Sequence, residues 1–197
     1  MARAIVFDLE YTAWEGSIAR GWSGPGELRE VVQIGAIAVD ADSFEETGTF
    51  NRFVRPRFNP VLSDYFTALT GITNARLANE AVGFRTAVDD FAAFMAADAA
   101  FAFGRDDETL NDNAALYGLE RALQPISGHN IRLWFNAHEV STDGVCSGEI
   151  ASAVGAEAGG PIHDAVGDCR SIAAAVRHLM ARGAPNPASD LGWSDAT

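Results

Sequence analysis

A short apolar run that ends in two carboxylates constrains this chain more than any other feature. Residues 5–10 (Ile-Val-Phe-Asp-Leu-Glu) have the composition of a buried strand. Side chains two residues apart in a strand point to the same face, so Asp8 and Glu10 are expected side by side at its end. Like charges at that separation repel, and a raised pKa, an arginine or a divalent cation must compensate them. The same pattern also occurs at solvated strand ends, so a functional site needs further partners.

Composition bounds the class of protein. The chain has 197 residues, of which 48% are hydrophobic and 21% charged, which fits one globular domain over residues 1–183. Two prolines within 184–197 predict a loose C-terminal tail. No apolar run reaches the roughly eighteen residues that cross a bilayer, and the chain leads directly into a strand, so we expect a cytoplasmic protein without a membrane partner. Cys146 and Cys169 follow no zinc-binding spacing and are expected to be reduced.

The charge limits how nucleic acid can bind. A formal net charge of −13 argues against a broad phosphate-binding surface. It does not exclude an enzyme that holds one strand end through metal ions, because such a site needs little basic area. All fourteen basic residues are arginine; arginine suits phosphate contact, although an arginine-only set follows equally from genomic base composition.

The order of predicted elements indicates an α/β fold. Strands over 4–9, 29–39 and 50–54 follow one another with turn-like connections, which predicts an antiparallel meander. Apolar residues at helical spacing then alternate with further strands, giving a mixed central five-stranded sheet flanked by helices. The remaining predicted elements are strands over 99–103 and 131–135, long helices over 84–97, 107–123 and 164–182, and short helices over 63–69, 74–77 and 147–154.

More acidic residues recur where strands give way to helices. Asp107 follows the fourth strand, and His163 and Asp168 lie at the start of the last helix. Ligands bind at strand ends in open α/β sheets, so these residues are expected to converge on Asp8 and Glu10. Four carboxylates favour two Mg²⁺ or Mn²⁺ ions over zinc, and two such ions support in-line displacement at phosphorus. His163 is then the candidate general base, although a lone histidine there is more commonly a surface residue.

These residues carry a family resemblance. The sequences Phe-Asp-Leu-Glu at 7–10, Gly-Arg-Asp-Asp at 104–107 and His-x₄-Asp at 163–168 resemble the three motifs of the DEDDh exonucleases. Residues 53–73 are similar to the Eri-type 3′ exonucleases in particular, and the resemblance spans about residues 4 to 182. It implies an RNase H-like fold and two bound metal ions. The implied site residues are Asp8, Glu10, Asp107 and Asp168 as metal ligands and His163 as general base.

One ligand in this set is a choice between neighbours. Asp106 adjoins Asp107, and Asp107 is preferred because the family places its second acidic residue three positions after a glycine that matches Gly104. The chain departs mildly from the family at Phe103, where many relatives have tryptophan.

Further residues are candidates for substrate contact. The backbone around Leu9 is expected to touch the terminal nucleotide, and Tyr11, Trp14 or Phe66 to stack on a base, unless they are ordinary core or surface aromatics. Thr70 either contacts the sugar or caps a turn. Gln33 is expected to be a buried hydrogen-bonding residue near the site rather than a ligand.

The sequence therefore predicts a metal-dependent 3′→5′ exonuclease that releases nucleoside 5′-monophosphates from single-stranded ends. The Eri-type resemblance favours RNA over DNA, and a DNA proofreading or repair exonuclease is the alternative. A different class is a non-catalytic nucleic-acid-binding module, which loss of the acids or the histidine would mark; all five are present. Protein partners and oligomeric state stay open.

Overall fold

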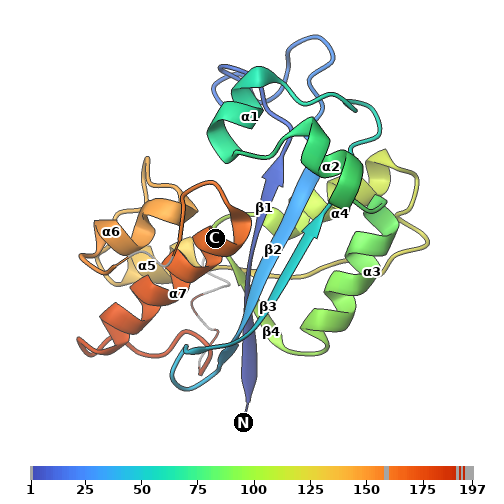
Figure 1. Ribbon diagram of the computed structural model, residues 1–197. Coiled ribbons are helices and arrows are strands. Elements are labelled where there is room, and N and C mark those ends of the chain that lie inside the picture. The colour runs from blue at the N-terminus through green and yellow to red at the C-terminus, as the bar shows by residue number, and fades with distance from the viewer. Residues whose placement is uncertain (1, 158–159, 190, 192, 194–197) are drawn as a thin grey trace.

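A mixed five-stranded sheet forms the centre of the computed structural model, which describes residues 2–157, 160–189, 191 and 193 (Figure 1). The strand order is β3–β2–β1–β4–β5. β1 pairs antiparallel with β2 and β2 with β3, whereas β4 is parallel to β1 and to β5. The predicted meander and mixed sheet are thus confirmed. The strands are β1 (Arg3–Tyr11), β2 (Val31–Asp40), β3 (Glu46–Phe53), β4 (Ala99–Ala102) and β5 (His129–Asn130).

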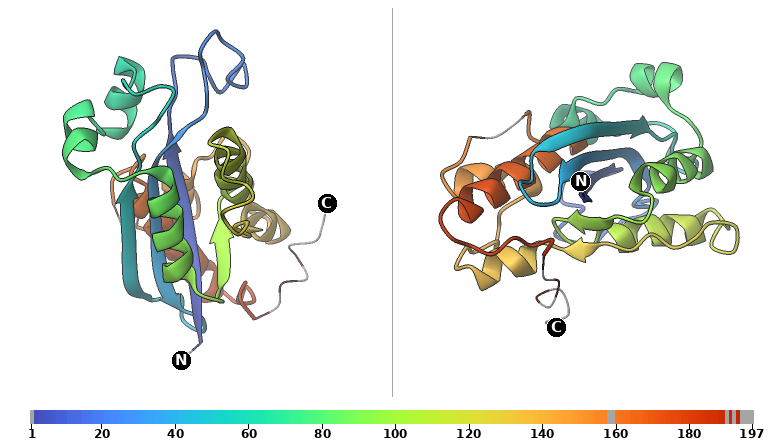
Figure 2. Two further views of the ribbon diagram at one scale, coloured as in Figure 1. Left: turned by 90° about the vertical axis from the view of Figure 1, so that its right-hand side faces the viewer. Right: turned by 90° about the horizontal axis from the view of Figure 1, so that it is seen from below.

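Helices cover both faces of this sheet (Figure 2). One apolar core lies between the sheet and α3 and α4, and a second lies between the sheet and α5, α6 and α7. Two short helices, α1 and α2, stand beyond the end of the sheet at which β1 finishes (Figure 1). The helices are α1 (Asp64–Thr70), α2 (Asn74–Glu80), α3 (Phe84–Met95), α4 (Asp106–Leu116), α5 (Arg132–Ala137), the 3₁₀ turn η1 (Ser147–Glu149), α6 (Ile150–Ala153) and α7 (Ala165–Met180).

Strand β1 divides its side chains between these two cores. Ile5 and Phe7 pack into the core of α3 and α4, whereas Val6 packs into the core of α7. Alternation continues past the apolar stretch, so Asp8 and Glu10 share the face of Val6. The sequence pattern alone therefore directs both carboxylates to the side of the sheet that α7 covers.

Side-chain caps fix where several helices begin. The hydroxyl of Ser63 accepts the N–H of the third residue of α1, and Thr73 does the same for α2. The carboxylate of Asp164 accepts the N–H of Gly167 in the first turn of α7 at 3.1 Å. Because α7 begins directly after Asp164, Asp168 lies in its first turn.

Two predicted elements are corrected by the structure. The predicted strand over residues 131–135 is wrong: these residues begin α5, and β5 is the preceding His129–Asn130. Ile131, Trp134 and Phe135 are all buried, and spacing of three and four residues is helical. The helix predicted over 107–123 ends at Leu116, because Gly118 takes a left-handed φ of 67° soon after it.

The described part of the predicted tail is packed rather than loose. The Asn186 amide donates to the carbonyl of Ala41 at 2.7 Å. Trp193 stacks on Phe101, with ring centroids 6.1 Å apart. The rest of the predicted tail, 190, 192 and 194–197, lies outside the described residues. Within the described residues, no helix combines the length and apolar character that crossing a membrane requires.

Candidate active site

Asp8 and Glu10 are buried at the end of β1, with 6% and 8% of their surfaces exposed. Asp8 lies opposite Gly35 of β2. A Cβ atom on Gly35 would lie 2.6 Å from the Cβ of Ala165, the first residue of α7. Glycine at this position therefore allows the start of α7 to approach the sheet directly beside Asp8.

Gln33 holds the same helix start in place. Its side chain is fully buried, opposite Glu10 in the β1–β2 pairing. Its amide donates to the Asp164 carboxylate at 2.9 Å and accepts the N–H of Ala165 at 3.3 Å. Gln33 is thus the buried hydrogen-bonding residue expected near the site, and it fixes the turn that carries the last motif.

One cleft is lined by Asp8, Glu10, His163 and Asp168. Asp168 reaches this cleft from the first turn of α7 and is 2% exposed. One carboxylate oxygen accepts the backbone N–H of His163 at 3.1 Å, and the other accepts the hydroxyl of Ser147 at 2.8 Å. A Cβ on Gly148 would lie 2.5 Å from Asp168 Oδ1. The segment that carries Ser147 and Gly148 therefore packs tightly against Asp168 and orients it.

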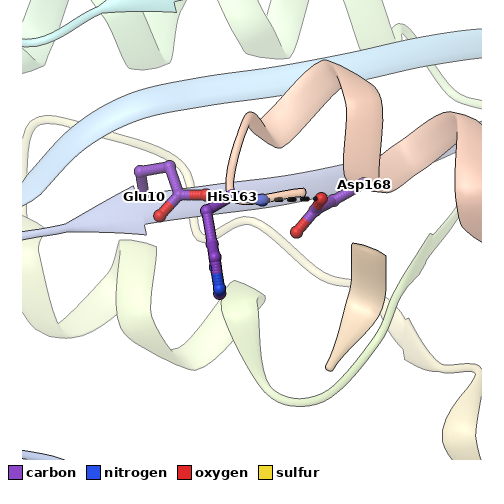
Figure 3. A group of neighbouring side chains, drawn as sticks. All are labelled: Glu10, His163 and Asp168. Atoms are coloured by element: carbon purple, nitrogen blue, oxygen red, sulfur yellow. Dashed lines mark hydrogen bonds between the residues drawn. The ribbon is translucent and has the colours of Figure 1, made fainter. Parts of the chain in front are cut away.

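Glu10, His163 and Asp168 come together on one side of the cleft (Figure 3). One ligand atom from each lies within 4.8 Å of the others. His163 precedes α7 with a left-handed φ of 62°, a conformation uncommon for residues other than glycine. Figure 3 shows the imidazole projecting away from the loop, with only the backbone N–H of His163 bound to Asp168. The ring is therefore available to a ligand in the cleft.

The fourth acidic residue in the cleft is Asp106. It lines the cleft with Asp8 and Asp168. Beside the effect of burial, the charge of Asp106 raises the pKa of Asp8, and the charge of Asp168 raises the pKa of Asp106. Asp107, chosen from the sequence, does not line the cleft. Its carboxylate lies 3.9 Å from the Arg105 guanidinium and accepts the N–H of Gly128 at 3.4 Å.

Burial, together with repulsion from nearby carboxylates, raises the pKa of each of the four cleft acids. Burial raises the pKa of Glu10 to about 8, with the charge of Asp168 adding to the effect. Burial and neighbouring carboxylates raise the pKa of Asp106 to about 7 and that of Asp8 well above its usual range. Burial raises the pKa of Asp168 to about 6, although its bond from Ser147 opposes the shift. The protein alone therefore disfavours the fully ionised cluster.

The donor set fits divalent cations. None of the four cleft acids forms an ion pair with an arginine within the part of the chain that the structure describes. Carboxylate oxygens are the ligands that Mg²⁺ and Mn²⁺ prefer, and bound cations would supply positive charge inside the cleft. The imidazole nitrogen of His163 lies within the same group of ligand atoms.

The cleft has a volume of about 460 Å³, and its walls are largely apolar. Leu9, Tyr11 and Phe66, expected from the sequence to contact substrate, line it. The other two expected residues lie elsewhere: among the described residues the wall does not include Trp14 or Thr70. The Thr70 hydroxyl instead donates to the carbonyl of Phe66 and accepts the N–H of Ile72 at the end of α1.

Sequence reasoning missed other residues of the cleft. Trp22 and Tyr65 line its wall, and Ser147 and Arg132 border it. The Arg132 guanidinium is held by the carbonyl of Thr142 at 2.7 Å. These residues come from loops and short helices that carry no periodic pattern, so the sequence offered no signal for them.

Comparison with known proteins agrees with this geometry. The RNase T family model, described as an exonuclease, matches residues 5–124, more than half of the chain. The chain belongs to this exonuclease family. The matched range contains Asp8, Glu10 and Asp106, whereas His163 and Asp168 lie beyond it.

Two curated proteins share part of the sequence. ERI1 exoribonuclease 2 of Xenopus laevis is 28% identical over 87 residues, which cover 44% of this chain and 12% of that protein. The 3′-5′ exoribonuclease 1 of Homo sapiens is 32% identical over 68 residues, which cover 34% of this chain and 18% of that protein. The matches thus span less than a fifth of either relative.

Solved structures show the same fold. The nuclease domain of 3′hExo, a DEDDh family member bound to rAMP, superposes with a TM-score of 0.77 at 22% identity, covering 92% of this chain and 93% of that one. The expected RNase H-like fold is therefore confirmed. The resemblance to the DEDDh exonucleases and their Eri-type group, drawn from the motifs, is confirmed as well.

Proposed function

We propose that this chain is a metal-dependent 3′→5′ exonuclease that removes nucleoside 5′-monophosphates from single-stranded ends. One observation carries the proposal: four carboxylates and a histidine face a single cleft, and no arginine within the described residues pairs with those carboxylates. Such a cluster favours divalent cations, and cation-dependent cleavage at phosphorus is the chemistry that this donor set suits.

We assign the ligand roles to Asp8, Glu10, Asp106 and Asp168. Divalent cations held there would lower the pKa of a water molecule and stabilise the charge that develops on the phosphoryl oxygens. Asp106 replaces Asp107 in this assignment because Asp106 lines the cleft and Asp107 bonds with Gly128 instead. Ser147 serves as a positioning residue, since its hydroxyl binds Asp168.

His163 takes the role of general base. Its imidazole accepts a proton from the attacking water, whose oxygen forms a bond to the terminal phosphorus. The bond between that phosphorus and the 3′ oxygen of the preceding nucleotide breaks, and the leaving oxygen takes up a proton from solvent. The products are a nucleoside 5′-monophosphate and a strand one nucleotide shorter with a free 3′-hydroxyl.

The aromatic and aliphatic part of the cleft wall suits a terminal nucleotide. Tyr11, Trp22 and Tyr65 present aromatic surface and Leu9 an aliphatic one, as stacking on a base requires. We propose RNA as the substrate rather than DNA. The support is that both curated relatives are named exoribonucleases and that the solved nuclease domain is bound to rAMP.

The test is digestion of a 5′-labelled single-stranded RNA and the matching DNA with Mn²⁺. A ladder that shortens from the 3′ end, and that His163→Ala abolishes, is the expected result. A higher rate on RNA supports the ribonuclease assignment, and a higher rate on DNA points to the proofreading or repair alternative. Metal binding without a ladder on either strand contradicts the proposal.

A further inference from the structure

A second cavity lies at the opposite end of α4 from the cleft. It has a volume of about 390 Å³ and mostly apolar walls. Three arginines, Arg55, Arg57 and Arg85, line it together with Tyr117. We call it the arginine pocket. Three of fourteen basic residues at one cavity stand out in a chain of net charge −13.

The loop that forms one side of this pocket is firmly anchored. The carboxylate of Glu30, fully buried, accepts the backbone N–H groups of Arg57, Phe58 and Asn59 at 2.6 to 3.0 Å. It also accepts the hydroxyl of Tyr117 at 2.6 Å. Glu30 therefore holds the loop through its backbone and not through the side chains of Arg57 and Phe58.

The arginines of the pocket are incompletely neutralised. Within the described residues, neither Arg55 nor Arg57 has a carboxylate within ion-pair distance. Arg85 faces Asp89 at 3.6 Å in an exposed pair one helical turn away, and such pairs are weak. The Arg55 guanidinium also donates to the backbone carbonyl of Ala81 at 3.1 Å, which leaves its charge in place. An anionic ligand would meet three positively charged guanidinium groups, of which only that of Arg85 has a carboxylate within ion-pair distance in the described part of the chain.

Exposed aromatic surface adjoins these charges. The ring of Phe58 is stacked on that of Tyr117, with centroids 5.9 Å apart and planes 7° from parallel. Phe58 is 47% exposed, and the Arg57 guanidinium lies 5.6 Å from its ring centroid. Planar rings beside guanidinium groups suit the bases and phosphates of single-stranded nucleic acid.

The pocket is connected to the cleft by continuous structure. Arg29 directly precedes Glu30, which anchors the loop of the pocket. The Arg29 guanidinium lies over the rings of Tyr11 and Trp22, which line the cleft. Helix α4 runs from Asp106 in the cleft to just before Tyr117 in the pocket. Its eleven residues span about 16 Å. A stacked strand covers that distance with about five nucleotides at roughly 3.4 Å each.

We propose that the arginine pocket binds the phosphate backbone of the substrate strand about five nucleotides upstream of its 3′ end. The proposal rests on the proposed function, because the strand's 3′ end must lie in the cleft. It makes the pocket a determinant of substrate length. Strands that are too short to extend beyond the cleft do not contact the arginine pocket, whereas longer strands contact it and bind more tightly.

The test compares the double variant Arg57→Gln/Arg85→Gln with the control Arg76→Gln/Arg182→Gln. Both remove two positive charges, and Arg76 forms an exposed pair with Glu80 like that of Arg85 with Asp89. The probes are single-stranded RNAs of three and twelve nucleotides. KM is measured for cleavage with Mn²⁺, and Kd by fluorescence anisotropy over a range of salt concentrations.

The pocket variant is expected to raise KM and Kd for the twelve-nucleotide strand about tenfold and to leave the three-nucleotide strand unchanged. The slope of log Kd against log salt should fall by about 1.4, since each lost contact to a single strand removes about 0.7. The control should match the wild type on both strands. Equal effects of the two double variants, or an equal loss on both strands, would overturn the proposal.

The outcomes separate this proposal from the proposed function. If the wild type cleaves both strands and the pocket variant behaves like the control, the pocket proposal fails and the exonuclease assignment stands. If the wild type cleaves neither strand, the exonuclease assignment fails. The anisotropy measurement then still decides whether the pocket binds a single strand, and a Kd that is the same for the pocket variant and the control overturns the pocket proposal.

Discussion

Buried carboxylates occur in two regions of this protein, and their surroundings differ. Glu30 is fully buried, and four donors of the protein, three backbone N–H groups and the hydroxyl of Tyr117, satisfy it. Asp8 and Glu10 in the cleft are also buried, but there burial and the charges of neighbouring carboxylates raise their pKa.

The difference teaches how to separate a structural acid from a candidate ligand. A buried charge is costly unless hydrogen bonds or an opposite charge compensate it. At Glu30 the protein itself supplies the compensation, so the acid holds a loop in place. In the cleft, Arg29 and His163 offset the acids only in part, since the pKa values stay raised. The remaining compensation has to come from outside the chain, which is what a cation site requires.

The largest effect that tests this comparison concerns two neighbouring acids. Asp106→Asn should lower the rate of single-strand cleavage at least about 100-fold, because it removes a cleft carboxylate that the proposal assigns to a cation. Asp107→Asn, the matched control one residue away, should stay within about threefold of the wild type. Steady-state cleavage of labelled RNA with Mn²⁺ measures both, and the reverse ranking would restore Asp107 as the ligand.

Replacing Glu30 should affect stability rather than metal binding. Glu30→Gln keeps the volume but removes the charge that four donors surround, so we expect unfolding to become easier by about 3 kcal/mol. The loss should be the same with and without Mn²⁺ in urea denaturation, and Glu120→Gln on the surface is the control. A loss that Mn²⁺ repairs would place Glu30 with the cleft acids.

The metal-free protein should lose stability as pH rises. Burial raises the pKa of folded Glu10 to about 8 and that of Asp106 to about 7, above their values in the unfolded chain. The stabilisation from a raised carboxylate pKa is present below the unfolded pKa and is lost as pH approaches the folded one. We expect the free energy of unfolding to fall by about 2 kcal/mol between pH 5 and 8. Urea denaturation in the presence of EDTA measures this fall.

Two controls sharpen the pH measurement. Glu10→Gln should flatten the dependence of stability on pH, since it removes a carboxyl group whose pKa burial raises to about 8. Mn²⁺ should restore stability at pH 8, because cations that bind the ionised cluster favour the folded state. A metal-free stability that is constant or increasing over this range would show that the cleft acids do not repel one another as described.

The smallest effect is expected at the residue that orients a ligand. Ser147→Ala removes the hydroxyl that Asp168 accepts at 2.8 Å. We expect the affinity for Mn²⁺, measured by calorimetry, to fall about tenfold, as is usual for a residue that positions a metal ligand. Ser152→Ala on the exposed side of α6 is the control, and equal affinities for the two variants would contradict a positioning role.

Much of the fold could be predicted because local patterns and tertiary packing agree. The alternation of β1 directed Asp8 and Glu10 to one face, and the helices predicted over 63–69 and 74–77 begin within one residue of α1 and α2. The prediction of the fifth strand over 131–135 was wrong because there the local pattern did not decide the structure. A run of apolar residues at 131–135 is compatible with either a strand or a buried helix, and only packing decided for α5.

The choice between two adjacent aspartates shows a further limit. Asp106 and Asp107 are the same residue type at the same strand-to-helix transition. Which of them faces the cleft depends on the turn between β4 and α4 and on the rotational phase of the helix. That phase is set by the packing of Leu110 into the core and by the contact of Asp107 with Gly128.

The sequence by itself determined the kind of chemistry, because carboxylate spacing within a strand and histidine–aspartate spacing at a helix start are local properties. Tertiary structure alone decided the membership of the cleft and the existence of the arginine pocket. Both assemble side chains from segments far apart in the chain. Arg57 follows β3 and Arg85 lies in α3, so the distance between them follows from tertiary packing rather than from any local pattern.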